Sequence, residues 1–184
     1  MKTLAKMFVL AVVAVVVPAA NAHFLWVDVD SSDASQAQAR IYFSEGGYAG
    51  SAELVDRLDP TVAWVLTKNN EPLELKLSNW TNDEEGVGAK VAPVSLSDTC
   101  SVEANCCYGV FARGDNTMLL NYSGKHLHLN SPAELNEVAK ADQLWLDIRP
   151  SLADDKLTLE VDYKGEPVNK ASLVVTDPAG EERE

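Results

Sequence analysis

Residues 108–122 read YGVFARGDNTMLLNY and contain the clearest secondary-structure signal in the chain. Two apolar runs, 108–112 and 117–122, flank the four turn-forming residues RGDN at 113–116. A short loop containing Gly and Asp between two such runs is typical of a β-hairpin. We therefore expect two adjacent antiparallel strands in the middle of the chain.

Similar short strand patterns, separated by turn residues, continue on both sides of this hairpin. Alternation of leucines with polar residues at 73–77 is the period of a half-buried strand, and 157–163 shows the same period. Other apolar runs lie at 24–29, 39–43, 62–67, 91–96 and 144–149. Helix signals are few: one turn is expected at 52–58 and one short helix at 131–139, which begins with the capping-box sequence SPAE. The pattern predicts an all-β, Ig-like β-sandwich with one or two short helices.

The polar stretch PSLADD at 150–155 divides the expected fold into two parts. We expect a β-sandwich domain over 23–150 and the start of a second Ig-like unit over 156–184. Two or three strands cannot close a sandwich, so this second unit is expected to be incomplete. The alternative is a hairpin that packs onto the first domain.

Residues 1–22 have the organisation of a secretory signal peptide. Two lysines precede an apolar run at 7–17, and Ala20-Asn21-Ala22 is a small-x-small cleavage site. The run is shorter than the roughly 20 residues that a membrane-spanning helix needs. We expect a periplasmic or secreted protein, without membrane insertion after processing, whose mature chain begins at His23.

The charge balance and the missing motifs exclude several classes of function. The chain carries 28 Asp and Glu against 15 Lys and Arg, a formal net charge of −13. An acidic surface argues against nucleic acid as a partner, because phosphate binding needs a basic face. The sequence has no phosphate-binding glycine loop, no GxSxG elbow and no HExxH. We predict a protein that is not an enzyme.

The three histidines are the strongest candidates for a binding site. At a mature N-terminus, the α-amino group and the imidazole of His23 can chelate one metal ion together. His126 and His128 are two residues apart, so both face one side of a strand, with Leu127 and Leu129 expected to face the core. One further imidazole completes a three-nitrogen set that suits Ni(II) or Cu(II). The alternative is that these histidines are plain surface residues.

Cys100, Cys106 and Cys107 form an odd set. In an exported protein one disulfide is expected, from Cys100 to either Cys106 or Cys107, with one thiol left over. The alternative is a cysteine thiolate that serves as a metal ligand.

Several short motifs together resemble the periplasmic nickel-uptake-transporter family. They are AHFLW at 22–26, IYFSE at 41–45, CYGVF at 107–111, LLNY at 119–122, KHL at 125–127 and GEPV at 165–168. The family has an AHxxW mature start and a C-terminal Ig-like unit. The resemblance implies an all-β periplasmic protein that captures nickel or cobalt for a membrane metal transporter.

Two other functions compete with metal uptake. Copper-dependent enzymes that cleave polysaccharides oxidatively also begin with a mature histidine and have a β-sandwich fold. In those enzymes a small residue usually follows the histidine, whereas Phe24-Leu25-Trp26 follows His23 in this chain. The second alternative is a metal-free structural Ig-like module, which the acidity and the Ig-like C-terminal segment favour.

Overall fold

The computed structural model describes residues 23–32, 36–47, 50–68, 71–154, 156–177, 179 and 181–183. The expected signal peptide, residues 1–22, lies outside the described residues. Strands make up 55% of the structure and helices 10%, which confirms the prediction of an all-β, sandwich-like fold. None of the helices within the described ranges is long and apolar enough to cross a membrane.

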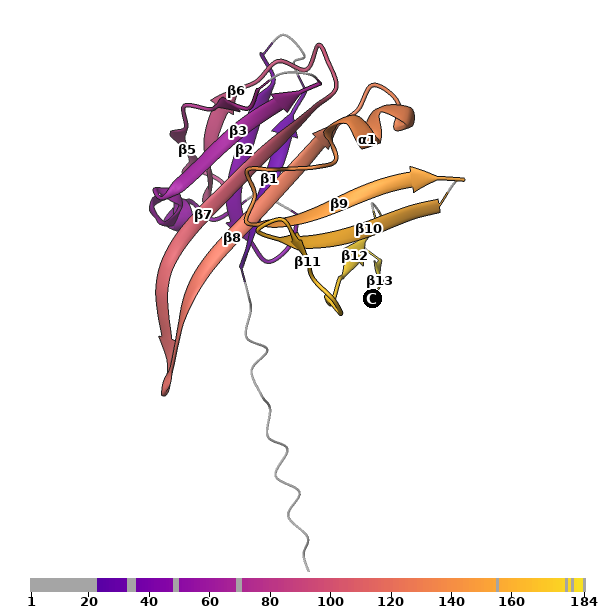
Figure 1. The fold of residues 1–184 in the computed structure, drawn as a ribbon. Helices are drawn as coiled ribbons and strands as arrows, with labels where there is room; N and C mark the ends of the chain where they lie inside the picture. Colours follow the sequence, from indigo (N-terminus) through magenta and orange to yellow (C-terminus); the bar gives the residue numbers. More distant parts are fainter. Residues whose placement is uncertain are drawn as a thin grey trace, which may run out of the picture.

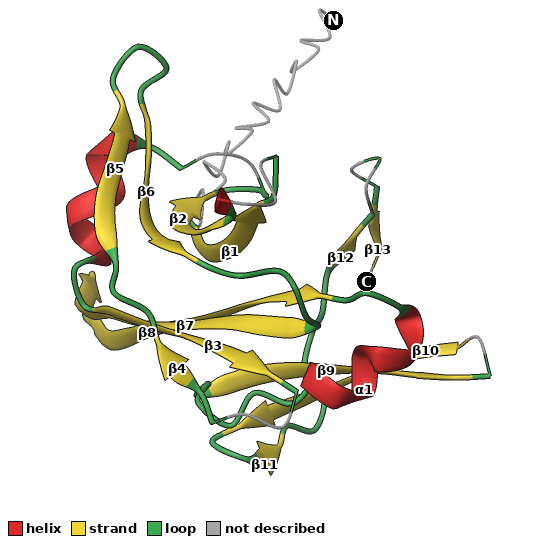
Figure 2. Cartoon of the chain, turned by 90° about the horizontal axis from the view of Figure 1, so that it is seen from above, coloured by secondary structure: helices red, strands yellow, loops and turns green. Residues whose placement is uncertain are grey.

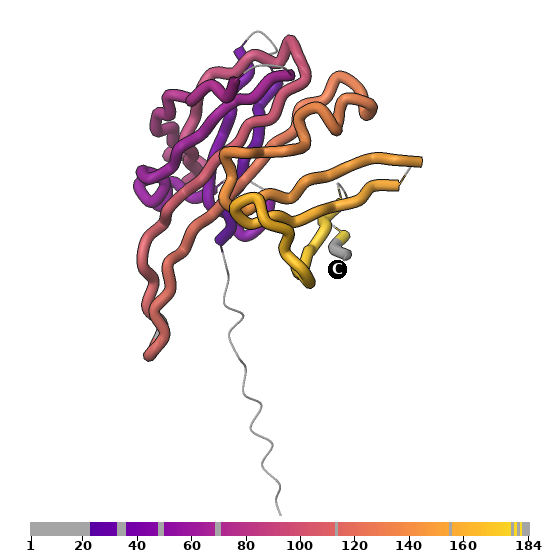
Figure 3. The backbone as a smooth tube through the Cα atoms, in the orientation of Figure 1, coloured from indigo at the N-terminus to yellow at the C-terminus, as the bar shows by residue number. Residues whose placement is uncertain are grey.

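The expected hairpin is present and is longer than the sequence indicated. Strand β7 (Cys100–Arg113) pairs with β8 (Asn116–His128), and Arg113 lies opposite Asn116 across a two-residue loop. Gly114, the first loop residue, has a φ of 60°, the conformation that a type II′ turn requires at that position. The register shifts between Cys107 and Gly109, and from this bulge to the turn the hairpin projects from the body as an arm (Figures 1 and 3).

Among the described residues, two four-stranded antiparallel sheets pack face to face (Figure 2). One has the order β1-β2-β6-β5, formed by Phe24–Asp30, Gln38–Ser44, Val87–Pro93 and Ser78–Asn82. The other has the order β4-β3-β7-β8, in which β4 is Leu73–Glu74 and β3 is Thr61–Thr67. The main core cluster takes side chains from both sheets and from the helix that connects them: Leu25, Ile41, Phe43, Leu58, Ala63, Ala104 and Cys106.

The edge strand β1 lies very close to β8 at one point. A Cβ atom on Gly124 would lie 2.8 Å from Val27 Cγ2 and 3.3 Å from the Leu25 carbonyl oxygen. Only glycine fits this approach without a shift of its neighbours. This contact fixes the position of β1 relative to the C-terminal end of β8. It therefore also fixes which residues of β1 lie beside His126 and His128.

Both expected helices are present and short. The 3₁₀ helix η2 (Ala52–Leu58) begins at Ser51, whose Oγ accepts a hydrogen bond from the Glu53 amide at 3.3 Å. The second helix consists of the 3₁₀ turn η3 (Pro132–Glu134) followed by α1 (Leu135–Val138). The capping-box prediction is wrong in detail, because Ser131 makes no side-chain cap and Glu134 instead accepts a hydrogen bond from Thr99 Oγ1.

The division of the chain differs from the expected boundary at 150–155. Strand β9 (Leu146–Ala153) runs through Pro150 and pairs along its whole length with β10 (Lys156–Tyr163). Residues 150–155 therefore form the end of a hairpin, and the strand expected at 144–149 belongs to the C-terminal sheet rather than to the sandwich. This sheet has the order β11-β10-β9, with β11 at Glu166–Pro167, and a short pair β12 (Val175–Thr176) and β13 (Glu182–Arg183) follows.

The expected disulfide is not formed, and all three cysteines are free. Cys100 and Cys106 lie on the same strand, six residues apart, which separates their Cα atoms by about 20 Å. A disulfide needs Cα atoms within about 7 Å of each other. Cys107 is farther still from Cys100 and points to the opposite face of β7 from Cys106.

We expect three titratable thiols per chain in protein purified without reductant. A thiol reagent added in denaturant checks this, because buried Cys100 and Cys106 become accessible only on unfolding. The thermal midpoint should also be the same with and without reductant. A count of one thiol per chain would contradict the β7 register.

Candidate functional site

The two histidines of β8 lie on the face that packs toward β1. Gly124, His126 and His128 alternate along the strand and therefore share this face. His126 Nδ1 lies 3.8 Å from Asp28 Oδ1, an oxygen that also accepts a hydrogen bond from the Val29 amide at 2.8 Å. The expectation that the histidines face away from the core is wrong, because this face of β8 continues from the core.

The imidazole of His126 is held in its neutral form at neutral pH. Burial lowers the pKa of His126, the Asp28 carboxylate opposes this shift, and the neighbouring His128 adds to it. The side chain of His126 is 28% exposed and that of Asp28 is 54% exposed. A neutral imidazole with an accessible edge and a carboxylate beside it can accept a cation.

The structure does not bring His23 to the other two histidines. His23 is exposed and directly precedes Phe24, the first residue of β1. His126 lies beside Asp28, which is five residues beyond His23. In an extended strand, five residues span about 17 Å. Within the described ranges, no group of three or more His, Cys, Asp or Glu residues is arranged to hold a metal ion.

One geometric observation bears on the alternative that a cysteine thiolate serves as a metal ligand. Cys100 lies directly opposite His128 in the β7–β8 ladder and is fully buried. Burial raises the pKa of the Cys100 thiol, and the nearby Asp98 carboxylate raises it further. The thiol is therefore protonated at neutral pH, so Cys100 is not a ready thiolate ligand.

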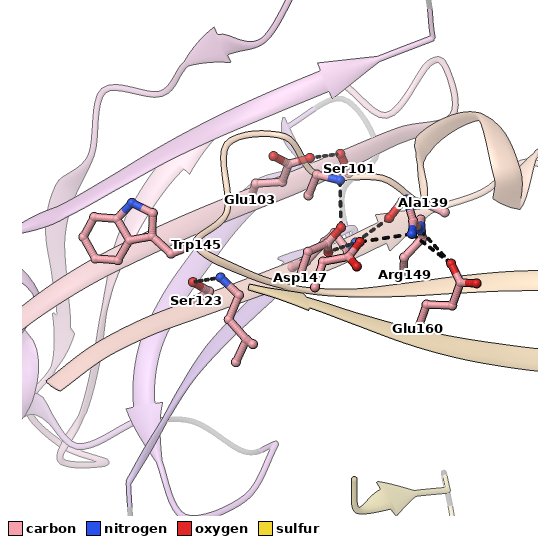
Figure 4. A network of polar contacts seen from close by, with 12 residues as sticks. Ser101, Glu103, Ser123, Ala139, Trp145, Asp147, Arg149 and Glu160 are labelled. Carbon is pink, nitrogen blue, oxygen red and sulfur yellow. Dashed lines mark hydrogen bonds and ion pairs between the residues drawn. The ribbon is translucent and has the colours of Figure 1, made fainter. Parts of the chain in front are cut away.

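A second polar site, which the sequence did not indicate, lies on the opposite face of the hairpin (Figure 4). The Lys125 ammonium pairs with Asp147 at the start of β9, and the two side chains are only 8% and 7% exposed. Lys125 Nζ also donates to the Ala139 carbonyl oxygen, and Asp147 Oδ2 accepts from the Ala141 amide at 3.0 Å. This buried ion pair joins the sandwich to the C-terminal sheet.

Residues 139–147, which we call the clasp, follow this face of the hairpin and are held to it by further polar contacts. Asn105 Nδ2 donates to the Gln143 carbonyl oxygen at 2.7 Å, and its Oδ1 accepts from the Trp145 amide at 3.4 Å. Ser123 Oγ donates to Asn105 Oδ1 at 2.7 Å and accepts from the Leu146 amide at 3.3 Å. The clasp is thus bound by side chains of both strands.

Glu103 lies beside the ion pair and is fully buried. Its Oε1 accepts a hydrogen bond from Ser101 Oγ at 2.7 Å, whereas its Oε2 has no hydrogen-bond partner among the described residues. Burial raises the pKa of Glu103 most; Ser101 and Lys125 oppose the shift, and the Asp147 and Asp142 carboxylates add to it. A buried carboxyl without a full set of partners favours its protonated form.

A period-two pattern in the sequence could have revealed this site. Ser101, Glu103 and Asn105 alternate with small or apolar residues, which marks a polar face on a central strand. The partner of that face, Asp147, lies about 40 residues away, and no local pattern links the two.

We expect Lys125→Met to lower the free energy of unfolding by about 3–5 kcal/mol, because it leaves Asp147 as an uncompensated buried charge. The double variant Lys125→Met/Asp147→Asn should lose less than Lys125→Met alone. Urea unfolding at pH 7 measures both. Lys140→Met is the matched control, since the Lys140–Asp142 pair is 62% and 71% exposed and should contribute about 1 kcal/mol or less. Equal losses for Lys125→Met and Lys140→Met would contradict the assigned ion pair.

Comparisons with known proteins identify no relative. No family model, no curated protein and no solved structure matches the chain. The resemblance to the nickel-uptake-transporter family therefore stays a prediction from the quoted motifs, and the site geometry is the basis for any functional proposal.

Proposed function

We propose that the protein is an exported, non-enzymatic binding protein for a divalent transition metal, and that His126, His128 and Asp28 supply its ligands. The observation that carries this proposal is the contact of 3.8 Å between His126 Nδ1 and Asp28 Oδ1, with His128 next on the same face of β8. Because burial holds His126 neutral, its lone pair is available at neutral pH.

The ligand atoms of the proposed site restrict which metal ions it can bind. Two imidazole nitrogens and one carboxylate oxygen suit nickel, cobalt or copper better than a hard ion such as calcium. Binding requires a rearrangement of side chains, since these residues are not already arranged around one point. Asp28 is more than half exposed, so rotation of its carboxylate disturbs little of the packing.

Association with metal uptake through a membrane transporter rests on the family resemblance alone. A metal-binding protein in the periplasm or outside the cell would supply such a transporter, with nickel or cobalt as the cargo.

We expect His126→Gln to weaken Ni(II) or Cu(II) binding by about tenfold or more. Isothermal titration of the processed chain, beginning at His23, measures this. His128→Gln and Asp28→Asn should weaken binding as well. His23→Gln is the matched control, because His23 lies at the far end of β1 and its substitution should leave the affinity unchanged.

The pattern of losses separates the possible sites. If His23→Gln lost affinity and the other three variants did not, the metal would be assigned to the N-terminal amine and imidazole, as the sequence first suggested. The copper-dependent polysaccharide-cleaving activity depends on that same result. Absence of binding by every form of the processed protein would refute metal binding altogether.

A metal-free interaction module is the second candidate, and the projecting arm of β7–β8 favours it. Val110 and Leu119 lie opposite each other on this arm and are 73% and 58% exposed. Phe111 and Met118, the next pair, are 43% and 44% exposed. Exposed apolar pairs on a protruding hairpin are typical of contact surfaces.

A further inference from the structure

The clasp is attached to the sandwich by polar groups together with three buried apolar residues, Ala139, Ala141 and Leu144, which belong to none of the core clusters identified among the described residues. The amides of Ala141, Trp145 and Leu146 donate to the side chains of Asp147, Asn105 and Ser123 respectively. Directed hydrogen bonds of this kind each contribute only a modest net free energy. Such a segment can open locally without loss of the apolar core between the two sheets.

The charges beneath the clasp are not balanced when Glu103 is ionised. The groups that face Glu103 are Lys125 on β8, Asp147 at the start of β9 and Asp142 in the clasp. On β3, the residue directly opposite is Trp64, which carries no charge. Lys125 is already paired with Asp147, and Asp142 has its own partner in Lys140 at 2.6 Å. An ionised Glu103 therefore adds a negative charge with no cation of its own.

We propose that Glu103 is a proton-operated latch for the clasp. With a proton on Glu103, the buried junction holds one ion pair and no excess charge, and residues 139–147 stay closed. When Glu103 loses the proton, the carboxylate gains free energy by reaching water, which requires the clasp to open. The latch lies on the opposite face of β7 from the side that carries Cys100 and Val102, so it is independent of the proposed metal site.

The direction of the effect follows from the burial of Glu103. Its pKa in the closed state is raised above that of a solvated carboxyl, so the closed state binds more protons over the intervening pH range. Closure is therefore favoured at low pH and is weakened as the pH rises. Between the pKa of the open state and that of the closed state, the opening equilibrium should grow by up to about tenfold for each pH unit, and above the closed-state pKa it should level off.

Hydrogen exchange of individual amides, corrected for the intrinsic pH dependence of exchange, tests the latch between pH 5 and pH 8. The protection of the Ala141, Trp145 and Leu146 amides should fall with rising pH, by up to about tenfold per unit. The amides of β2, in the sandwich core, should keep a higher protection. In Glu103→Gln, the clasp amides should stay protected and lose this pH dependence.

Two further variants make the test specific. Ser101→Ala removes the hydrogen bond that favours the charged form of Glu103 in the closed state, so the fall in clasp protection should continue to a higher pH before it levels off and should be larger there. Glu74→Gln is the matched control, because Glu74 is exposed on β4, which is separated from β7 by β3 in the same sheet, and it should behave as the unchanged protein does. An unchanged pH profile in both Glu103→Gln and Ser101→Ala would overturn the latch. Equal protection and equal pH dependence of the clasp and of β2 would overturn it too, since the clasp would then open only by global unfolding.

Discussion

The pairing of β7 with β8 determines which side chains face the core and which face the clasp. Both strands are central to the chain, and both of their faces are covered over the part that lies within the body. The inner face packs against β1 and β2 and contributes Ala104 and Cys106 to the main core. The outer face holds Lys125 and Glu103 beneath the clasp. A shift of one residue in this register would exchange the two faces and place charges in the core.

The two faces use different physical interactions. Burial of apolar side chains on the inner face stabilises the sandwich without directional requirements. The outer face joins the C-terminal sheet through the Lys125–Asp147 pair, whose desolvation offsets much of its Coulombic attraction. Such a pair contributes little to the free energy of folding but selects one way for β9 to dock on the hairpin. Any other docking of β9 leaves both charges without a partner.

Local patterns predicted much of the fold, and the failures have a common cause. The hairpin turn at Gly114, the helix that begins after Ser51 and the alternation along 157–163 depend on neighbouring residues alone. The disulfide prediction failed because no local pattern shows that one strand of 14 residues spans all three cysteines. The contact between Asp28 and His126, like that between Lys125 and Asp147, joins distant segments, so no local pattern could reveal it.

Two of the hairpin's titratable groups, His126 and Glu103, favour their neutral forms in the folded chain, and no single pH makes both neutral in the unfolded chain. Burial lowers the pKa of His126 from about 6.5 and raises the pKa of Glu103 from about 4.5, so the folded chain favours the neutral form of each. In the unfolded chain, His126 is neutral only above about pH 6.5 and Glu103 only below about pH 4.5. At neutral pH, the free energy of folding is made less favourable by Glu103, which must take up a proton or be buried as an anion. In acid it is made less favourable by His126, which must lose a proton or be buried as a cation. Between about pH 4.5 and pH 6.5 both groups have this effect. Groups that destabilise the fold at every pH are expected at sites with a role other than stability, and these two lie at the candidate metal site and at the clasp.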